Sequence, residues 1–413
     1  MQYGLIGEKL SHSFSKEIHE SLASYTYELC EIARENLADF LAKREFSAIN
    51  VTMPYKKEVI PHLDEVSAVA NELQAVNCIV NKDGKLYGYN TDYFGMRDLI
   101  LRSRIDLSGK KVLILGTGGT SRTSSLVCKD LGADKIIRVS RNANDGAITY
   151  KEAYEKHIDA DVIINTTPIG MYPNCDNSPL DLSEFSNLCA VFDAVYNPLR
   201  TKLVIDAKAN GIYAEGGLYM LVSQAVHAVE LFIDTNFDED KTDDIFHKIL
   251  KEKENIVLIG MPSCGKTTVG KVLADRFSRN LIDLDDEIVK RIGCEISDFF
   301  KTHTEKEFRD IETEITKDIS KKNGIIIATG GGCVLREENV NALRQNGKLY
   351  FLDRDLANLT PTDSRPLATK KEAIEKLYNE RYDIYTSRCD CRIDGNLTPE
   401  EEAKLIEKEF LEK

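Results

Sequence analysis

The sequence predicts an α/β protein in which parallel sheets are covered by helices. Short apolar runs alternate with helix-period segments along all 413 residues, which is typical of α/β layers. Two of these runs lead directly into a glycine-rich turn and then a helix, at Gly116–Gly119 and at Gly260–Gly265. At about 150 residues per domain, the length allows two or three domains.

Nine apolar runs are expected to form strands. They are Gln2–Ile6, Ala48–Thr52, Lys111–Leu115, Ile136–Val139, Val162–Asn165, Val191–Ala194, Ile256–Ile259, Ile325–Ala328 and Lys348–Leu352. A polar, acidic stretch at 235–244 and the charged segment 251–255 interrupt the pattern, so we place the main domain boundary near residue 250. A softer division is expected at 108–110, where a glycine turn precedes a strand.

The composition points to small-molecule partners in the cytoplasm. The net charge is −14, Trp is missing and aromatic residues make up 8%, which argues against binding to nucleic acid or to a membrane. The sequence has no run of about 18 uncharged apolar residues, and no Lys or Arg precedes the first apolar run, so neither a membrane span nor a signal peptide is expected. Ten cysteines are scattered without a Cys-x-x-Cys pair, as in proteins with reduced thiols. The oligomeric state is left open.

The clearest chemical motif is a phosphate-binding loop. Gly260–Thr267 has the pattern Gly-x-x-x-x-Gly-Lys-Thr and lies between an apolar run and a helix-period segment, as this loop requires. Its glycines let backbone N–H groups converge on phosphate oxygens at a helix N-terminus. Lys266 is expected to contact the β- and γ-phosphates of a nucleotide, and the Thr267 hydroxyl to bind Mg²⁺. The motif leaves the phosphoryl acceptor open.

Carboxylates and arginines downstream of this loop are candidates for the acceptor site. Asp283 and Asp285 are expected on one face of a strand end, where they can orient Mg²⁺ and accept a proton from a hydroxyl. Arg309 and Glu312 are three residues apart on a predicted helix, so their side chains are neighbours. Each pattern alone also fits a solvated acidic turn or a surface charge. The later motifs are Thr329–Gly332, Ser364–Leu367 and Glu380–Tyr382.

In this order, these motifs resemble shikimate kinase over residues 254–413. The resemblance implies catalytic roles for Asp285 and Lys266, and a Mg²⁺ site at Thr267 and Asp283. The implied shikimate contacts are Asp285, Arg309, Gly331 and Arg381. The implied ATP contacts are Gly260, Ser263, Cys264, Gly265, Lys266, Thr267, Thr268 and Arg365.

The turn at Gly116–Gly119 indicates a dinucleotide site. Its Gly-x-Gly-Gly pattern, between the apolar run Lys111–Leu115 and a helical stretch, lets backbone amides face a pyrophosphate. The next predicted strand ends in Ser140, Arg141 and Asn142. An NAD site prefers Asp or Glu at this tip, whereas a cation suits the 2′-phosphate of NADP. Arg141 therefore favours NADP over NAD.

Two polar clusters precede this turn in otherwise apolar surroundings. The first, Ala48–Lys56, ends in Lys56. The second comprises Ala75–Asn77 and Gly88–Gly95, and it contains Asp92. A lysine and an aspartate beside a nicotinamide form a proton-transfer pair for carbonyl reduction. A surface lysine and a helix cap are the alternative interpretations of these two residues.

These clusters and the glycine turn resemble shikimate dehydrogenase over residues 1–240. The motifs in the family's order are Ser11–Ser13, Asn50–Lys56, Ala75–Asn77, Gly88–Asp92, Gly116–Gly119, Asn165–Met171, Asp193–Pro198 and Gly217–Gln224. The resemblance implies that Lys56 and Asp92 are the catalytic pair. The implied substrate contacts are Ser11, Ser13, Asn50, Thr52, Asn77 and Gln224. The implied NADP contacts are Gly116, Gly118, Gly119, Thr120, Arg141, Tyr196 and Gly217.

The two resemblances imply a bifunctional enzyme, a two-lobed dehydrogenase fused to a P-loop kinase domain. The expected parts are a substrate lobe at 1–100 joined by a late helix at 218–234, a Rossmann NADP lobe at 101–217, a linker at 235–253 and the kinase domain at 254–413. The implied reactions are NADPH-dependent reduction of 3-dehydroshikimate and Mg·ATP-dependent phosphorylation of shikimate to shikimate 3-phosphate. The alternatives are an NAD-linked quinate or shikimate dehydrogenase fused to a kinase, and a catalytically inactive shikimate sensor.

Replacing Arg141 by Asp is expected to raise the KM for NADPH and to relax discrimination against NADH. The substitution removes a charged partner of the 2′-phosphate, and a charge-assisted hydrogen bond contributes on the order of 1.5–3 kcal/mol. Steady-state kinetics with both cofactors measure the effect. An unchanged preference for NADPH would show that Arg141 does not select the cofactor.

Overall fold

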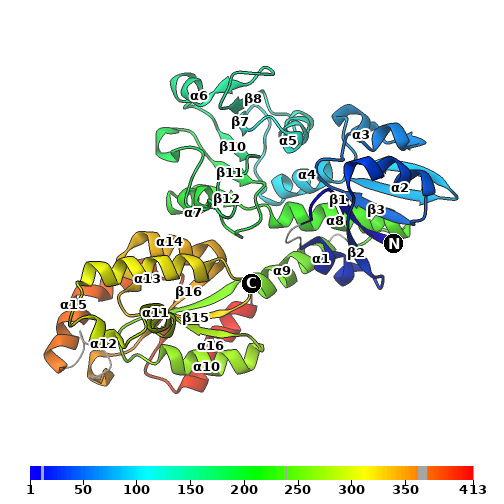
Figure 1. Cartoon of the computed structure of the whole chain (residues 1–413). Coiled ribbons are helices and arrows are strands. Elements are labelled where there is room, and N and C mark those ends of the chain that lie inside the picture. The colour runs from blue at the N-terminus through cyan, green and yellow to red at the C-terminus, as the bar shows by residue number, and fades with distance from the viewer. Residues whose placement is uncertain (11–13, 239, 361–369, 413) are drawn as a thin grey trace. The chain divides into compact units, whose positions relative to one another are not determined.

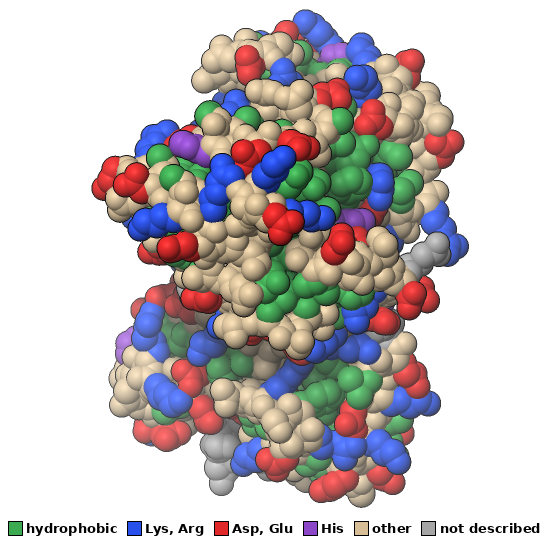
Figure 2. All heavy atoms as spheres, turned by 90° about the vertical axis from the view of Figure 1, so that its right-hand side faces the viewer, with side chains coloured by type: hydrophobic (Ala, Val, Ile, Leu, Met, Phe, Trp, Pro, Cys, Tyr) green, Lys and Arg blue, Asp and Glu red, His purple; other side chains and the backbone are tan. Residues whose placement is uncertain are grey.

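A computed structural model describes residues 1–10, 14–238, 240–360 and 370–412, and these fold into three helix-covered sheets (Figure 1). The chain divides into two compact units, Met1–Ile249 and Leu250–Lys413. The predicted α/β class is confirmed. Within the described ranges, the helices fall short of the length and apolar character that a membrane span requires. Basic and acidic side chains are interspersed on the face drawn in Figure 2.

The first sheet of unit 1 is mixed, with strand order β2-β1-β3-β5-β6-β4. Its strands are β1 (Tyr3–Gly7), β2 (Tyr27–Glu31), β3 (Ala48–Val51), β4 (Glu65–Val66), β5 (Cys78–Lys82) and β6 (Lys85–Tyr89). The helices in this part of the chain are α1 (Ser15–Leu22), α2 (Leu37–Lys43), α3 (Ala68–Leu73) and α4 (Asp92–Arg102). Alternate residues of β3 enter two separate apolar clusters, Ile49 with Leu41 of α2 and Ala48 with Tyr27 of β2. Both faces of the sheet are therefore buried, which explains the unbroken apolar run of β3.

The second sheet of unit 1 is wholly parallel, with strand order β12-β11-β10-β7-β8-β9. Its strands are β7 (Lys111–Leu115), β8 (Lys135–Ser140), β9 (Ile148–Thr149), β10 (Val162–Asn165), β11 (Ala190–Asp193) and β12 (Tyr213–Glu215). Its helices are α5 (Gly119–Asp130), α6 (Tyr150–Lys156) and α7 (Lys202–Ala209). The strand order reverses direction at β7, and the glycine turn predicted as a dinucleotide site follows this strand. In doubly wound sheets such a reversal point is where ligands bind.

Helix α8 (Leu218–Ile233) follows the second sheet in the chain but packs on the first. Its Ala228 and Phe232 belong to the apolar cluster that also holds Leu5 and Tyr27. Helix α8 also lies along α4 (Figure 1). The two helices thus bring residues from distant parts of the chain to one place.

Helix α9 (Lys241–Lys253) occupies most of the segment predicted as a linker. Its Ile245, Phe246 and Ile249 are buried, and the Phe246 ring packs edge-on against Tyr219 of α8. Arg102 lies over both rings and forms an ion pair with Asp243. One apolar helix face thus lies within this segment of polar composition.

Unit 2 contains one parallel sheet, with strand order β14-β15-β13-β16-β17. Its strands are β13 (Asn255–Ile259), β14 (Leu281–Asp283), β15 (Ile326–Ala328), β16 (Gly347–Asp353) and β17 (Cys391–Asp394). Its helices are α10 (Lys266–Phe277), α11 (Leu284–Ile292), α12 (Ile296–Phe299), α13 (Glu305–Ser320), α14 (Glu337–Asn346), α15 (Lys371–Arg388) and α16 (Pro399–Leu411). The phosphate-binding loop connects the central strand β13 to α10, as predicted.

All nine predicted strands are present, with ends that differ by at most one residue. Seven strands within the described residues were not predicted, namely β2, β4, β5, β6, β9, β12 and β17. Five of them lie at sheet edges, whereas β5 and β6 lie inside the first sheet. Three of the five residues of β2 are exposed, as are two of the four residues of β17, so neither strand has an apolar run. A second difference concerns Asp285, which we expected on a strand. Strand β14 ends at Asp283, whose side chain accepts a hydrogen bond from the Asp285 backbone N–H and caps α11. Asp285 therefore lies in the first turn of that helix.

Glu402 on α16 makes the stability of unit 2 depend on pH. Its side chain is buried, Oε2 has no hydrogen-bond partner among the described residues, and burial raises its pKa to about 7. The unfolded chain releases this proton at an ordinary pKa of 4.5, whereas the folded chain holds it until pH 7. The free energy of unfolding therefore falls as the pH rises between these values and stays low above them.

Replacing Glu402 by Gln removes this ionisation, so the variant is expected to melt about 3 °C or more above the wild type at pH 8. The difference should shrink towards pH 5, where both side chains are uncharged. Thermal unfolding of the full chain between pH 5 and 8 measures it. Glu400→Gln, an exposed change on the same helix, is the matched control. A pH-independent difference would contradict the assignment.

Candidate active sites

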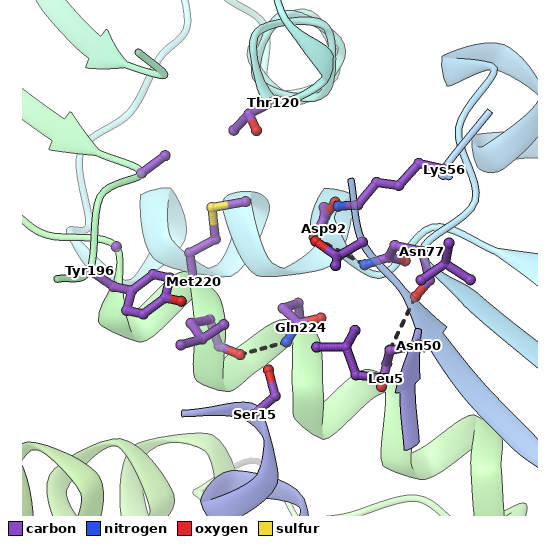
Figure 3. Close-up of a pocket in the computed structure, with 15 residues that line it drawn as sticks. Leu5, Ser15, Asn50, Lys56, Asn77, Asp92, Thr120, Tyr196, Met220 and Gln224 are labelled. Carbon is purple, nitrogen blue, oxygen red and sulfur yellow. Dashed lines mark hydrogen bonds and ion pairs between the residues drawn. The ribbon is translucent and has the colours of Figure 1, made fainter. Parts of the chain in front are cut away.

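Unit 1 contains a cavity of about 210 Å³ whose lining comes from β1 and β3 of the first sheet, from the helices α1, α4, α5 and α8, and from loops that include the segment after β11 (Figure 3). Nine predicted site residues line it, namely Asn50, Thr52, Lys56, Asn77, Asp92, Thr120, Tyr196, Gly217 and Gln224. The remaining lining residues are Leu5, Ser15, Val51, Ala194, Met220 and Leu221. Ser11 and Ser13 lie outside the described residues. Residues that are more than 160 positions apart in the sequence thus share one cavity.

Lys56 and Asp92 meet at this cavity as an ion pair. Lys56 Nζ lies 2.5 Å from Asp92 Oδ2, and their side chains are 28% and 20% exposed. Lys56 follows β3 in a turn, and Asp92 begins α4, where the helix dipole stabilises a carboxylate. Figure 3 shows Lys56 reaching across to Asp92 at the edge of the cavity. The pair is close enough to solvent to exchange protons and sufficiently enclosed to face a bound ligand.

Asn77 fixes the other carboxylate oxygen of Asp92. Its Nδ2 donates to Asp92 Oδ1 and to Thr91 Oγ1, both at 3.0 Å. Its Oδ1 accepts a 2.7 Å hydrogen bond from the Thr91 backbone N–H. Both amide hydrogens of Asn77 are therefore engaged within the protein. In this structure Asn77 holds the catalytic candidate Asp92, a contact that the sequence did not reveal.

Asn50 and Gln224 face the cavity from opposite elements. Asn50 is buried on β3, and its Oδ1 accepts a 2.8 Å hydrogen bond from the Tyr27 hydroxyl. Gln224 projects from α8, and its Nε2 donates to the Leu221 carbonyl at 2.9 Å. Thr91 Oγ1 lies 3.3 Å from Gln224 Oε1. Amide groups from two elements are thus held at defined positions around the cavity.

The glycine turn after β7 has room for a dinucleotide. Gly116 has φ of +112°, a conformation that L side chains rarely adopt. A Cβ added at Gly118 or Gly119 would meet no atom within 4 Å, so a ligand can approach this backbone closely. Arg141 is exposed just beyond the end of β8. These features match a pyrophosphate over the turn and a ribose near Arg141.

Asp193, the first residue of the motif Asp193–Pro198, has a structural role. It is fully buried at the end of β11, and burial raises its pKa to about 7. It accepts hydrogen bonds from Asn165 Nδ2 (2.9 Å), the Val195 N–H (2.9 Å) and Thr201 Oγ1 (2.6 Å). Asp193 therefore ties the ends of β10 and β11 together and positions the segment that carries Tyr196.

The phosphate-binding loop of unit 2 is organised around Lys266. Lys266 is buried, and Nζ donates to the carbonyl oxygens of Gly260 (2.8 Å) and Met261 (2.9 Å). Ser263 Oγ is buried and has no hydrogen-bond partner among the described residues. The loop thus holds a buried cation beside a buried hydroxyl, which suits an anion such as phosphate.

Thr267 and Asp283 form an oxygen pair next to this loop. Thr267 Oγ1 donates to Asp283 Oδ2 at 2.6 Å, joining the start of α10 to the end of β14. Mg²⁺ takes one or two such protein oxygens together with phosphate oxygens and waters. The pair fits that role. Arg365, expected to close over ATP, lies outside the described residues.

A buried charge cluster lies beside Asp285. Arg309 NH1 donates to Glu312 Oε2 at 2.7 Å, and these side chains are only 9% and 1% exposed. Burial raises the pKa of Glu312 above its ordinary range. A Cβ added at Gly330 would lie 2.7 Å from Asp285 Oδ1 and 3.0 Å from Glu312 Oε1. Asp285 and the cluster therefore meet at the glycine segment after β15.

Arg381 and Gly332 complete this region. Arg381 is buried on α15, and its NH1 donates to the Gly331 carbonyl at 3.0 Å. A Cβ added at Gly332 would lie 2.3 Å from both terminal nitrogens of Arg309. The lack of a side chain at Gly332 is what allows the Arg309 guanidinium its position. The predicted acceptor residues Asp285, Arg309, Gly331 and Arg381 are thus brought together.

Several residues that shape the sites were not predicted as site residues. Met220 and Leu221 lie one helical turn before Gln224, so helical periodicity from Gln224 could have found them. Tyr27 acts through Asn50 rather than by facing a ligand. A tyrosine on an exposed-looking edge strand carries no local signal of this kind.

Comparisons with protein families match both parts of the chain. The profile of the shikimate dehydrogenase substrate binding domain matches residues 5–79, and the shikimate kinase profile matches residues 262–411. The shikimate dehydrogenase (NADP(+)) of Clostridium beijerinckii is 36% identical over 261 residues, covering 59% of this chain and 96% of the relative. The enzyme of the same name from Clostridium perfringens strain SM101 is 37% identical over 265 residues, covering 60% of this chain and 97% of the relative.

Solved structures match the same part of the chain. A chorismate mutase/shikimate 5-dehydrogenase fusion protein from Clostridium acetobutylicum is 36% identical, with a TM-score of 0.57, and the match covers 60% of this chain and 96% of that one. The Thermus thermophilus shikimate 5-dehydrogenase in complex with NADP(H) and shikimate is 28% identical, with a TM-score of 0.54, and the match covers 60% and 99%.

Replacing Gly332 by Ala is expected to displace the Arg309 guanidinium while leaving unit 2 folded, because the clash falls on the end of a flexible side chain. Binding of an anionic acceptor should weaken about tenfold, since a charge-assisted hydrogen bond contributes about 1.5–3 kcal/mol. The measurement is the KM for the acceptor and for ATP, with thermal unfolding as the control. A change confined to the KM for ATP would contradict the placement of Arg309 in the acceptor site.

Proposed function

Because this chain belongs to the shikimate dehydrogenase family and carries a C-terminal shikimate kinase domain, we propose that it performs two consecutive reactions. The first is NADPH-dependent reduction of 3-dehydroshikimate to shikimate. The second is phosphorylation of shikimate at its 3-hydroxyl with ATP and Mg²⁺. The observation that carries the proposal is the presence in one chain of two sets of reacting side chains, the Lys56–Asp92 pair in its cavity and the Lys266–Asp285 set.

In the first reaction, Lys56 supplies the proton. NADPH, when bound, supplies the hydride that reduces the carbonyl carbon. The Lys56 ammonium donates a proton to the carbonyl oxygen as the C–O double bond becomes single, and Lys56 then regains a proton from solvent. Asp92 holds the ammonium 2.5 Å away, and Asn77 holds Asp92. Asn50, Thr52 and Gln224 are proposed to bind the ring substituents, as are Ser11 and Ser13.

NADP is proposed to lie on the second sheet of unit 1, in a lobe spanning 101–217. Backbone amides of Gly118 and Gly119, with Thr120, would bind the pyrophosphate at the start of α5. Arg141 would bind the 2′-phosphate. Tyr196 and Gly217 line the cavity on the same side as Thr120 and would flank the nicotinamide. The substrate lobe, 1–100 with the helix at 218–234, supplies the remaining walls.

In the second reaction, Asp285 is the proposed proton acceptor. Mg·ATP, when bound, supplies the γ-phosphoryl group. Asp285 would orient the 3-hydroxyl and take its proton as the hydroxyl oxygen bonds to the γ-phosphorus and the bond from that phosphorus to ADP breaks. Lys266 would leave the loop carbonyls to contact the β- and γ-phosphates, and Thr267 with Asp283 would hold Mg²⁺. Arg309 and Arg381 would bind the carboxylate of shikimate, with Arg365 proposed to close over ATP.

Two single substitutions test whether the reactions use separate side chains. Lys56→Ala is expected to abolish NADPH oxidation by 3-dehydroshikimate and to leave ATP-dependent phosphorylation of added shikimate near the wild-type rate. Asp285→Asn should do the reverse, because it removes the proton acceptor while the first cavity is untouched. Both activities are measured on each purified variant.

Thermal unfolding is the control for both variants. A wild-type chain without either activity would reject the proposed function. Loss of both activities in one stably folded variant would reject the assignment of separate side chains to the two reactions.

A further inference from the structure

A buried aromatic cluster stands directly behind the cavity of unit 1, and the mechanism above does not use it. Its members are Tyr3 of β1, His19 of α1, Tyr25 just before β2, Tyr27 of β2 and Phe232 of α8. Two of them carry a hydroxyl with a defined partner. Tyr25 OH lies 2.8 Å from His19 Nδ1, and Tyr27 OH donates to Asn50 Oδ1 at 2.8 Å. One hydroxyl therefore stays within the cluster, and the other reaches a cavity residue.

Tyr27 is held rigidly in place. Its side chain is 0% exposed, and its ring stacks on His19 with centroids 4.0 Å apart and planes 19° apart. Burial keeps the pKa of Tyr27 well above its ordinary value and lowers the pKa of His19 to about 3. Tyr27 thus stays a hydroxyl that can donate, and it stacks on a neutral ring.

The Asn50 amide is oriented by two neighbours. The Asn77 backbone carbonyl can only accept, so the Asn50 group that lies 3.2 Å from it must be the NH₂. The Tyr27 hydroxyl donates to the other end, which must be the oxygen. An NH₂ group has two hydrogens, and only one is directed at Asn77. The second is directed at neither of these two neighbours, and Asn50 lines the cavity.

We propose that Tyr27 is a positioning residue of the dehydrogenase site, whose hydroxyl keeps the Asn50 amide turned so that an N–H faces the cavity and binds an oxygen of the substrate. This inference rests on the proposed function, because it takes the substrate to be an oxygen-rich anion such as shikimate. Without the Tyr27 hydroxyl, the Asn50 amide keeps only its hydrogen bond to the Asn77 carbonyl and can rotate away from this orientation.

Tyr27→Phe keeps the ring and removes only the hydroxyl. Loss of one oriented hydrogen bond is expected to raise the KM for shikimate about fivefold in the oxidation direction, with kcat and the KM for NADP⁺ within about twofold. Tyr25→Phe is the matched control. It removes a hydroxyl from the same cluster, but that hydroxyl contacts His19 and not Asn50, so the KM for shikimate should not change.

A double-substitution cycle shows whether Tyr27 acts through Asn50. In an Asn50→Ala background, adding Tyr27→Phe should leave the KM for shikimate unchanged, because the group that Tyr27 orients is gone. An equal effect of Tyr27→Phe in both backgrounds would overturn the proposal. A fivefold rise of the KM for shikimate in the Tyr25→Phe variant would also overturn it, because it would indicate general loosening of the cluster.

Asn50→Asp poses the same question if Tyr27→Phe fails to fold. It keeps an acceptor for the Tyr27 hydroxyl and replaces the N–H by a second acceptor, so the KM for shikimate should rise at least tenfold. An unchanged KM would overturn the proposal. A wild-type chain that does not oxidise shikimate with NADP⁺ would overturn the proposed function itself, whereas an active wild type with an unaltered Tyr27→Phe variant overturns only the role of Tyr27.

Discussion

The ion pair between Lys56 and Asp92 depends on backbone positions that apolar packing fixes. Lys56 is held in a turn after β3, and Asp92 is held at the start of α4. Strand β3 is buried on both faces, and α4 packs along α8, so neither residue moves without disturbing a core. Asn77, the residue before β5, donates a hydrogen bond from its side chain to Asp92 and so holds that carboxylate in place. Charged groups are brought together here by apolar packing that precedes any ligand.

The two sites solve opposite proton problems. Carbonyl reduction needs a proton delivered to an oxygen, and the candidate at the first site is a cation, Lys56, kept in place by a carboxylate. Phosphoryl transfer needs a proton removed from a hydroxyl, and the candidate at the second site is a carboxylate, Asp285, beside the buried Arg309–Glu312 pair. At the first site the partner of opposite charge, Asp92, holds the reacting group in place.

The sequence predicts the central strands of the two wholly parallel sheets and the ligand-facing motifs well because both leave local signals, whereas β5 and β6 inside the mixed sheet were not predicted. Strand β13 and the loop that ends in Lys266 are adjacent in sequence and in space, and so are β7 and its glycine turn. Edge strand β2 leaves a weak signal, because exposed residues interrupt its pattern. Tyr27 lies on that strand, so its contact with Asn50, 23 positions away, was beyond prediction.

Helices raised a different difficulty. Asp283 and Asp285 are spaced as neighbours on a strand face, and only the capping hydrogen bond shows that the strand ends between them. The segment at 235–253 reads as polar because charged and polar residues outnumber apolar ones, while Ile245, Phe246 and Ile249 recur at helical spacing and are buried. The composition of a whole segment does not show such an apolar face, whereas the spacing of its apolar residues does.

In the proposed pair of reactions shikimate binds at two sites, and the two sites have different electrostatic requirements. In the proposed reduction, the charge of the substrate is the same before and after hydride and proton transfer, so neutral amides such as Asn50 and Gln224 suffice to orient it. Phosphorylation adds negative charge to an acceptor that is already an anion, close to the phosphates of the nucleotide. Coulomb repulsion between such groups is large in a partly buried site, and cations must offset it. In the proposed phosphorylation the buried guanidinium groups of Arg309 and Arg381 would meet that need, whereas the amide-lined cavity proposed for the reduction does not require them.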